Sequence, residues 1–302
     1  MIMVDDYWCS EAESILPNTD KRVLVASLNK RYDYNYCKQF DLIASCTTGT
    51  DHIDNRDIPL IKLEGEFLKD IYATAEHTWA LILSLIRKVA FAFDDVKQGN
   101  WEREKWQGTE LRGKTLGIVG MGRIGQQIAR MAEAFGMKVI TYDTTIWMGR
   151  KEQGNMAIEF PLYQYCHLEH LLQNSDIITV HVPLTEETKG MFSIEQFKQM
   201  KPTAYFINTS RGAVVDEDAL LNALHNDIIA GAAIDVTTFE TERKPFGEDI
   251  EDIRNQNELV WYAKHNDNLI ITPHIGGNTI ESREKTQIHI ANKIKEYIQN
   301  EM

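Results

Sequence analysis

The sequence predicts an α/β protein with a doubly wound parallel sheet and a second, smaller α/β domain of reduced size. From residue 115 onward, short β-branched runs alternate with helical patterns, which is typical of βαβ units. Residues 21–61 contain two further strand patterns, RVLVAS and FDLIAS, ahead of a long helical segment. The length of 302 residues also favours about two domains.

Composition excludes several classes of partner. The formal net charge is -13, whereas nucleic acids and anionic membranes require a basic surface. The first residues, MIMVDDYWCSEAE, carry acids where a secretion signal needs basic residues. The strongest apolar run, Trp79 to Ile86, is far shorter than the ~20 residues of a membrane-spanning helix, and the four dispersed cysteines lack metal-site spacing. We therefore expect a cytoplasmic protein with no metal, no nucleic-acid partner and no membrane partner.

Six strands are predicted in the larger domain. In chain order they are TLGIVG, MKVITYD, SDIITVHVP, TAYFIN, IAGAAID and LIIT. Helical patterns separate them, and one opens with the capping-box pair Ser193 and Gln196 and stops before Pro202. Parallel strands joined in this way bind ligands beyond their carboxyl ends, so the residues that follow each strand are the candidates for a site.

Two helical segments connect the domains. Residues 75–96 are predicted as one helix that bridges them, and apolar residues at helical spacing near the end of the chain predict a helix that returns to the first domain. We therefore assign residues 78–274 to the larger domain and residues 1–77 with 275–302 to the smaller one. Residues 241–266 are polar and form a long excursion between two core strands.

A glycine motif follows the first strand of the larger domain. Gly120, Gly122 and Gly125 stand in GxGxxG order before an amphipathic helix, and the next strand ends in Asp143, 18 residues after Gly125. Such glycines permit a tight turn, the approach of a pyrophosphate to the helix N-terminus, and close packing of helix on sheet. Asp143 would bind the ribose hydroxyls and repel a 2′-phosphate, which favours NAD over NADP. The alternatives are a plain glycine-rich turn and a turn acid.

Four more residues stand at strand ends. Arg211 lies in the turn after FIN, Asp235 ends GAAID, Glu240 follows five residues later, and His274 lies in TPHIGG. A guanidinium can hold a carboxylate and polarise a carbonyl, and a carboxylate beside a histidine favours its protonated form, as a general acid and base requires. The alternatives are a surface arginine and a structural histidine.

Five motifs in one order carry a family resemblance. They are GIVGMGRIGQQIA, ITVHVPLTEETKGMF, FINTSRGAVVDEDAL, GAAIDV with Glu240, and ITPHIGGNTIES. From about residue 42 to 290 the chain resembles the D-isomer-specific 2-hydroxyacid dehydrogenases, particularly the phosphoglycerate dehydrogenase branch. The resemblance implies a Rossmann-type NAD-binding domain, a flavodoxin-like α/β substrate domain, and hydride transfer between nicotinamide and C2 of a D-2-hydroxy or 2-oxo acid.

The resemblance also implies residue roles. Arg211 would bind the substrate carboxylate and carbonyl, His274 would be the acid and base, and Glu240 would support His274. The backbone of Thr48, Gly49 and Thr50, within TTGTDHID, would hold the carboxylate. The residues that would contact the cofactor are Gly120, Gly122, Arg123, Ile124, Gly125, Asp143, Val182, Pro183, Thr188, Thr209, Ser210, Asp235 and Gly276. The helix at Trp79 resembles a segment that contributes to a dimer contact, so we expect a homodimer.

The chain departs from the family pattern in two places. The segment before TTGTDHID is short by one βα unit relative to the family, and Thr241 follows Glu240 where the family commonly has proline. After RVLVAS come Asn29, Lys30 and Arg31, which would bind a second anionic group of the substrate if they faced the cleft; the alternative is a solvated basic loop.

Two other functions stay open. The family resemblance includes NAD-binding corepressors with little or no turnover, although Arg211, Glu240 and His274 are all present here. Another Rossmann enzyme, such as an amino-acid dehydrogenase, would require a catalytic lysine, and the strand-end motifs that contain Arg211, Asp235 and His274 have none.

Overall fold

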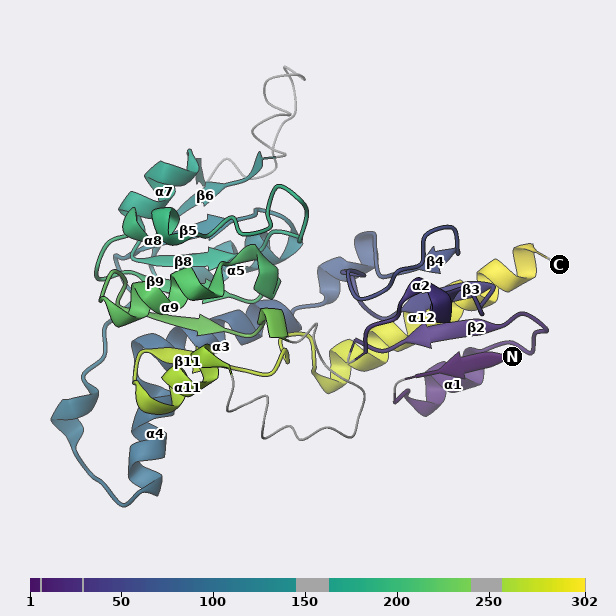
Figure 1. Cartoon of the computed structure of the whole chain (residues 1–302), viewed down its shortest axis with the longest axis horizontal. Helices are drawn as coiled ribbons and strands as arrows, with labels where there is room; N and C mark the ends of the chain where they lie inside the picture. Colours follow the sequence, from purple (N-terminus) through teal and green to yellow (C-terminus); the bar gives the residue numbers. More distant parts are fainter. Residues whose placement is uncertain (6, 29, 145–162, 240–256, 302) are drawn as a thin grey trace. The chain divides into compact units, whose positions relative to one another are not determined.

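The computed structural model describes residues 1–5, 7–28, 30–144, 163–239 and 257–301 (Figure 1). The chain divides into two compact units. Of the described residues, unit 1 contains Met1–Ala73, Phe239 and the chain from Gly277 onward, and unit 2 contains Thr74–Thr238 and residues 257–276. The chain thus leaves unit 1, builds unit 2, and then returns to unit 1.

Unit 1 contains four parallel strands within the described residues, in the order β1-β2-β3-β4. The strands are β1 (Ile2–Val4), β2 (Val23–Ala26), β3 (Leu42–Ser45) and β4 (Leu60–Ile61). Chain order is what remains when the second strand is taken from the 2-1-3-4-5 order of a flavodoxin-like sheet. This agrees with the short segment noted before TTGTDHID. The sequence predicted only β2 and β3, because the outer strands are too short to show a pattern.

Helices cover the sheet of unit 1. They are α1 (Ser10–Ile15), α2 (Tyr34–Cys37), the 3₁₀ helix η1 (Glu66–Asp70) and α12 (Ile280–Asn300). β2 and β3 are buried along their whole length, so alternate residues pack on opposite faces. One face packs on Ile290, Ala291, Ile294 and Ile298 of α12. The other packs on the hydrophobic cluster that contains Tyr32, Cys37 and Ile53.

Unit 2 is a doubly wound sheet. Seven parallel strands pair within the described residues, in the order β11-β10-β9-β8-β5-β6-β7. Their bounds are β5 (Thr115–Val119), β6 (Lys138–Tyr142), β7 (Gln164–Tyr165), β8 (Ile177–Val180), β9 (Tyr205–Asn208), β10 (Gly231–Ile234) and β11 (Leu269–Ile271). The six predicted strands are all present, and β7 is an additional strand of two residues. The strand order reverses between β5 and β8, which is where such sheets bind ligands.

Helices lie on both faces of this sheet (Figure 1). Their bounds are α3 (Ala73–Ile86), α4 (Val89–Lys97), η2 (Arg103–Trp106), α5 (Arg123–Ala134), α7 (Leu168–Asn174), α8 (Ile194–Lys198), η3 (Gly212–Val214), α9 (Glu217–His225) and α11 (Glu258–His265). One hydrophobic cluster contains residues of α3 and α5, and the other contains residues of α7, α8, α9 and α11. The capping box predicted at Ser193 and Gln196 is confirmed at the start of α8.

The helix predicted over residues 75–96 is two helices, and the prediction of one was wrong. Lys88 has a left-handed backbone with φ 58°, which ends α3 and lets α4 start in a new direction. α3 is buried in unit 2, and Trp79 is only 4% exposed. The apolar residues that face outward lie on α4 instead, where Phe93 is 63% exposed.

Neither a membrane span nor a metal cluster is found in the part of the chain that the structure describes. No helix there combines the length and the apolar character needed to cross a bilayer. No group of three or more histidine, cysteine, aspartate or glutamate side chains there could hold a metal ion.

Candidate functional site

The glycine motif forms the connection from β5 to α5. Gly120 has φ 98°, and a Cβ there would lie 2.6 Å from the carbonyl oxygen of His181. At Gly125 a Cβ would lie 2.2 Å from the carbonyl oxygen of Gly120, so only glycine lets the helix approach the turn. A Cβ at Gly122 would meet no atom within 4 Å, and Gly122 opens α5. The loop therefore leaves open space at a helix N-terminus, where a phosphate binds well.

Asp143 lies beside this loop because β6 is the neighbour of β5. Its Oδ2 accepts a hydrogen bond of 2.8 Å from the backbone N–H of Met121, and Gly120 N–H donates to Tyr142 O at 2.9 Å. The carboxylate therefore lies at the carboxyl end of β6, directly against the glycine turn. Arg123 and Ile124 begin α5, and burial lowers the pKa of Arg123.

The segment after β8 forms the other wall of the glycine loop. Val182 follows His181, whose backbone contacts Gly120. The imidazole Nε2 of His181 is 2.8 Å from Thr179 Oγ1, and burial lowers the pKa of His181 to about 3. The turn beyond it is fixed by Thr188, whose hydroxyl donates to Pro183 O at 2.6 Å.

The turn after β9 is held by Asn208. Its Oδ1 accepts from Ser210 N–H at 3.0 Å and from Ser210 Oγ at 2.8 Å, while its Nδ2 donates to Arg211 O at 3.0 Å. The guanidinium of half-buried Arg211 donates to Ser210 O at 2.8 Å. Thr209 Oγ1 is 2.8 Å from Thr78 Oγ1, which ties the turn to α3. The turn therefore fixes the position from which Arg211 extends.

Gly212 brings this turn against the end of the next strand. A Cβ at Gly212 would lie 2.2 Å from the backbone carbonyl carbon of Thr237, so no larger residue fits. Glu217 joins the two segments, because its carboxylate accepts from Thr238 N–H at 2.5 Å and from Thr238 Oγ1 at 2.9 Å. The Arg211 turn is thus packed directly on the segment that follows Asp235.

Asp235 directly follows β10, is 1% exposed, and binds the loop that carries His274. Its carboxylate accepts from Ile275 N–H at 2.9 Å and from Gly276 N–H at 2.7 Å. Burial raises the pKa of Asp235, but hydrogen bonds from His77, Thr272 and Ile275 outweigh it, so the pKa lies below its usual range. The carboxylate is therefore charged at neutral pH.

His274 has a left-handed backbone, with φ 54°. Its N–H donates to Asp235 O at 2.8 Å and to Thr272 O at 3.0 Å. A left-handed conformation costs a residue with a Cβ roughly 1 kcal/mol or more, and persists only where the surroundings hold it. Such strain clusters at functional sites, which supports the choice of His274 as a candidate.

Most predicted site residues therefore share one edge of unit 2. β8, β5 and β6 are neighbours, as are β9, β10 and β11, and all are parallel. Their carboxyl ends bring together the glycine loop, Asp143, the Val182–Pro183 segment, the Arg211 turn and the His274 turn. Glu240 lies outside the described residues, so its predicted place beside His274 stays a prediction.

The predicted substrate loop lies in unit 1, after β3. Ser45 Oγ is 2.7 Å from Thr47 Oγ1, and Thr47 Oγ1 donates to Gly49 O at 2.7 Å. Ile53 N–H donates to Thr50 O at 3.0 Å, which closes the turn. The carbonyl groups of Gly49 and Thr50 are thus bonded within the loop. The chain from Thr48 to Thr50 is therefore held in a compact turn, and Thr48 is exposed.

The basic residues after β2 are arranged differently from a free anion site. Lys30 Nζ donates to Asp5 Oδ1 at 2.5 Å, and the Tyr32 hydroxyl donates to Asp5 Oδ2 at 2.7 Å. Burial and the hydrogen bond to Asp5 raise the pKa of Tyr32. Arg31 is exposed, and Asn29 lies outside the described residues. Lys30 is therefore part of an ion pair that the sequence pattern did not reveal.

Three residues of unit 2 were missed from the sequence. Asn208 directly precedes the predicted residue Thr209, and Thr272 lies two residues before His274. Both stand at strand ends, and this position in the sequence could have identified them. His77, whose Nε2 is 3.1 Å from Asp235 Oδ1, lies on α3, and nothing local marks it.

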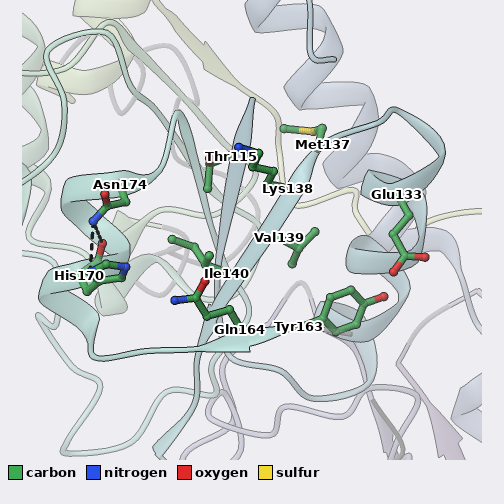
Figure 2. A pocket seen from close by; sticks show the side chains of 10 residues that line it. All are labelled: Thr115, Glu133, Met137, Lys138, Val139, Ile140, Tyr163, Gln164, His170 and Asn174. Atoms are coloured by element: carbon green, nitrogen blue, oxygen red, sulfur yellow. Dashed lines mark hydrogen bonds between the residues drawn. The ribbon is translucent and has the colours of Figure 1, made fainter. Parts of the chain in front are cut away.

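An open cavity of about 530 Å³ lies away from these residues (Figure 2). It is lined by Thr115, Glu133, Met137, Lys138, Val139, Ile140, Tyr163, Gln164, His170 and Asn174. Thr115 and Lys138 begin β5 and β6, so the cavity lies at the amino ends of the strands. Open parallel sheets bind their ligands at the opposite edge, and the cavity is therefore not the candidate site.

Comparison with known proteins identifies the larger unit. The family model for "D-isomer specific 2-hydroxyacid dehydrogenase, NAD binding domain" matches residues 79–276, more than half of the chain. A glyoxylate reductase from Thermococcus litoralis is 42% identical over 255 residues, which cover 80% of this chain and 69% of the relative.

Two further similarities extend this result. A D-3-phosphoglycerate dehydrogenase from Synechocystis is 35% identical over 251 residues, which cover 82% of this chain and 41% of the relative, so the chain spans about two fifths of that protein's length. A D-lactate dehydrogenase structure from Aquifex aeolicus, with NAD and lactic acid, has a TM-score of 0.73 and 30% identity, covering 97% of this chain and 86% of that one. None of these similarities favours the corepressor alternative.

Proposed function

Because the chain belongs to the D-isomer-specific 2-hydroxyacid dehydrogenases, we propose that it interconverts a D-2-hydroxy acid and a 2-oxo acid with NAD. The observation that carries the proposal is the arrangement of unit 2, in which the Arg211 and His274 turns end strands on either side of β10, at the same edge as the glycine loop. A cation for a carboxylate and an imidazole for proton transfer are what this reaction requires.

NAD fits the residues present. Gly122 leaves open space at the N-terminus of α5 for a pyrophosphate, and Asp143 lies against the glycine turn, where its carboxylate would accept hydrogen bonds from a ribose. Bound NADH supplies the hydride that reduces C2 of the oxo acid. The turns at the same edge hold the remaining predicted cofactor contacts, which are Val182, Pro183, Thr188, Thr209, Ser210, Asp235 and Gly276.

The chain's own residues handle the substrate and the proton. The guanidinium of Arg211 holds the substrate carboxylate and stabilises charge on the reacting oxygen, and His274 gives that oxygen a proton. Glu240 is proposed to hold the imidazole in its protonated form. The backbone of Thr48, Gly49 and Thr50 is proposed to bind the carboxylate, which assigns substrate binding to unit 1.

The test is NADH oxidation with a panel of 2-oxo acids. We expect turnover with at least one member, and a His274→Ala variant should lose ~100-fold or more in kcat while it binds NADH nearly as well as the wild type. A protein that binds NADH but turns over no member would support the corepressor alternative. Near wild-type turnover of His274→Ala would refute the role of His274.

We propose further that the substrate carries a single negative charge, which reverses the hypothesis of a second anion bound by Lys30 and Arg31. Asp5 follows β1, and the 47–50 loop follows β3, so both lie at the carboxyl edge of one sheet, two strand spacings or roughly 10 Å apart. Lys30 is already paired with Asp5. Because Asp5 offsets the charge of Lys30, the pair offers a second substrate anion no net attraction. At an effective dielectric of about 20, freeing one positive charge ~10 Å from such an anion would be worth roughly 1.5 kcal/mol, or about tenfold in binding.

This proposal is tested by replacing Asp5. Asp5→Asn should raise kcat/KM for a 2-oxo dicarboxylic acid about tenfold relative to a short monocarboxylic one. The matched control is Asp41→Asn, because Asp41 precedes β3 and binds Arg22 N–H at the opposite edge of the sheet. If Asp5→Asn leaves the ratio of kcat/KM for the two acids unchanged, Asp5 does not select against a second negative charge on the substrate.

We propose a homodimer that uses α4. Val89, Phe93 and Val96 are 56%, 63% and 47% exposed, and their spacing places them on one helix face. A row of exposed apolar side chains of this kind is typical of an interface. Phe93→Glu should shift the sedimentation mass toward a monomer, whereas Trp261→Glu, at a 54% exposed aromatic on α11, should not.

A cytoplasmic location stays a prediction from the sequence.

A further inference from the structure

The buried carboxylate of Asp235 is the centre of a four-donor cluster. Oδ2 accepts from Gly276 N–H, and Oδ1 accepts from Ile275 N–H at 2.9 Å and from Thr272 Oγ1 at 2.5 Å. The fourth group is His77, whose Nε2 is 3.1 Å from Oδ1. A buried carboxylate is tolerated only when its oxygens are bonded, so each donor contributes to keeping Asp235 charged.

Three of the four donors flank His274 in the sequence. Thr272 precedes it by two residues, Ile275 and Gly276 follow it, and all three donate to Asp235. His274 itself is bonded through its backbone to Asp235 O, and has the left-handed φ of 54°. The Asp235 carboxylate therefore holds the chain on both sides of the strained residue.

The hydrogen bonds determine which atom of His77 carries the proton. Thr272 donates its single hydroxyl hydrogen to Asp235, and the carboxylate can only accept. Because Nε2 of His77 is 3.1 Å from both Thr272 Oγ1 and Asp235 Oδ1, Nε2 must be the donor to both. His77 extends from α3, so it ties that helix to the His274 turn.

The packing around this donor leaves little freedom. A Cβ at Gly276 would lie 2.9 Å from Asp235 Oδ2, 3.5 Å from Thr74 Cγ2 and 3.6 Å from His77 Cδ2. The side chain of His77 is 17% exposed. Loss of the imidazole would therefore have two effects at once. It would open a space beside the Asp235 carboxylate, and it would remove one of the hydrogen-bond donors of that carboxylate.

We infer that His77 is a positioning residue for the proposed reaction: through Asp235 and Thr272 it holds the strained turn from which His274 reaches the substrate. The inference rests on the proposed role of His274. The donor matters rather than the ring, because the contact is made by one N–H. An amide nitrogen at the same reach, as in glutamine, replaces it.

The experiment compares His77→Ala and His77→Gln with the wild type, and His170→Ala is the control at an exposed helical histidine. We expect His77→Ala to lower kcat by about tenfold or more, with KM for the oxo acid within about twofold, and His77→Gln to keep kcat within about threefold. Hydrogen exchange of the peptide over residues 272–277 should accelerate in His77→Ala and stay unchanged in His77→Gln and His170→Ala.

The outcomes separate positioning from packing. Equal loss of kcat in both His77 variants, or normal kcat in His77→Ala with a lowered Tm, would show that the imidazole only fills space. If the wild-type protein reduces no 2-oxo acid, the proposed function fails, and hydrogen exchange still decides whether His77 holds the His274 turn.

Discussion

Protonation of His181 is expected to destabilise unit 2 below neutral pH. Burial lowers the pKa of this imidazole from 6.5 to about 3, so between these values the unfolded chain binds a proton that the folded chain does not. Stability then falls as pH falls. Integrating this difference from pH 7.5 to 4.5 gives about 2.5 kcal/mol lost through His181 alone.

The perturbation is His181→Gln. Glutamine keeps a nitrogen or oxygen within reach of Thr179 Oγ1, the partner of His181 Nε2 at 2.8 Å, but cannot be protonated. The quantity to follow is the free energy of unfolding of the wild type minus that of the variant. This difference should fall by about 2.5 kcal/mol between pH 7.5 and pH 4.5, because only the wild type has His181. The carboxylates that titrate in this range are common to both proteins and cancel in the difference.

The assay must report on unit 2 alone, since two units need not unfold together. Urea unfolding followed by hydrogen exchange of β8 meets this need, with measurements at several pH values. A gap that stays constant within about 0.5 kcal/mol over this range would refute the reasoning, because His181 would then titrate alike in both states.

Other outcomes follow from single contacts. Gly125→Ala should abolish NADH binding and lower Tm by several degrees, measured by fluorescence titration and calorimetry, because its Cβ would lie 2.2 Å from Gly120 O. Asp143→Ser should lower the NADH preference over NADPH by about tenfold in kcat/KM, and equal use of both cofactors by the wild type would contradict the role of Asp143. Gly212→Ala should lower kcat/KM for the oxo acid more than NADH affinity, because it displaces the Arg211 turn from Thr237.

The glycine loop and its strands could be predicted because their signals are local. The GxGxxG spacing, the strand before it and the helix after it all lie within residues 115–134, and the structure confirms that arrangement. Strand ends likewise marked Arg211, Asp235 and His274, since parallel sheets place such residues at one edge. β1 and β4 could not be predicted, because three and two residues are too few for a period-two pattern.

The parts that escaped prediction depend on contacts between distant residues. His77 and Asp235 are 158 positions apart, and only folding brings them together. The pair of Lys30 with Asp5 joins two strand ends whose neighbour relation follows from sheet order rather than from composition. The break between α3 and α4 depends on the left-handed backbone of Lys88. Lysine has no preference for this conformation, so the sequence does not predict the break.

The return of α12 to unit 1 constrains the order in which the protein can fold during translation. Ile290, Ala291, Ile294 and Ile298 complete the hydrophobic cluster that contains Val23, Val25 and Leu42. The ribosome synthesises these early strands first, but their covering helix emerges only after all of unit 2 has been made. Unit 2 has its own two hydrophobic clusters and can fold while the nascent strands of unit 1 still expose apolar faces. We therefore expect chaperones to engage unit 1 during synthesis, and its final packing to wait until α12 has left the ribosome.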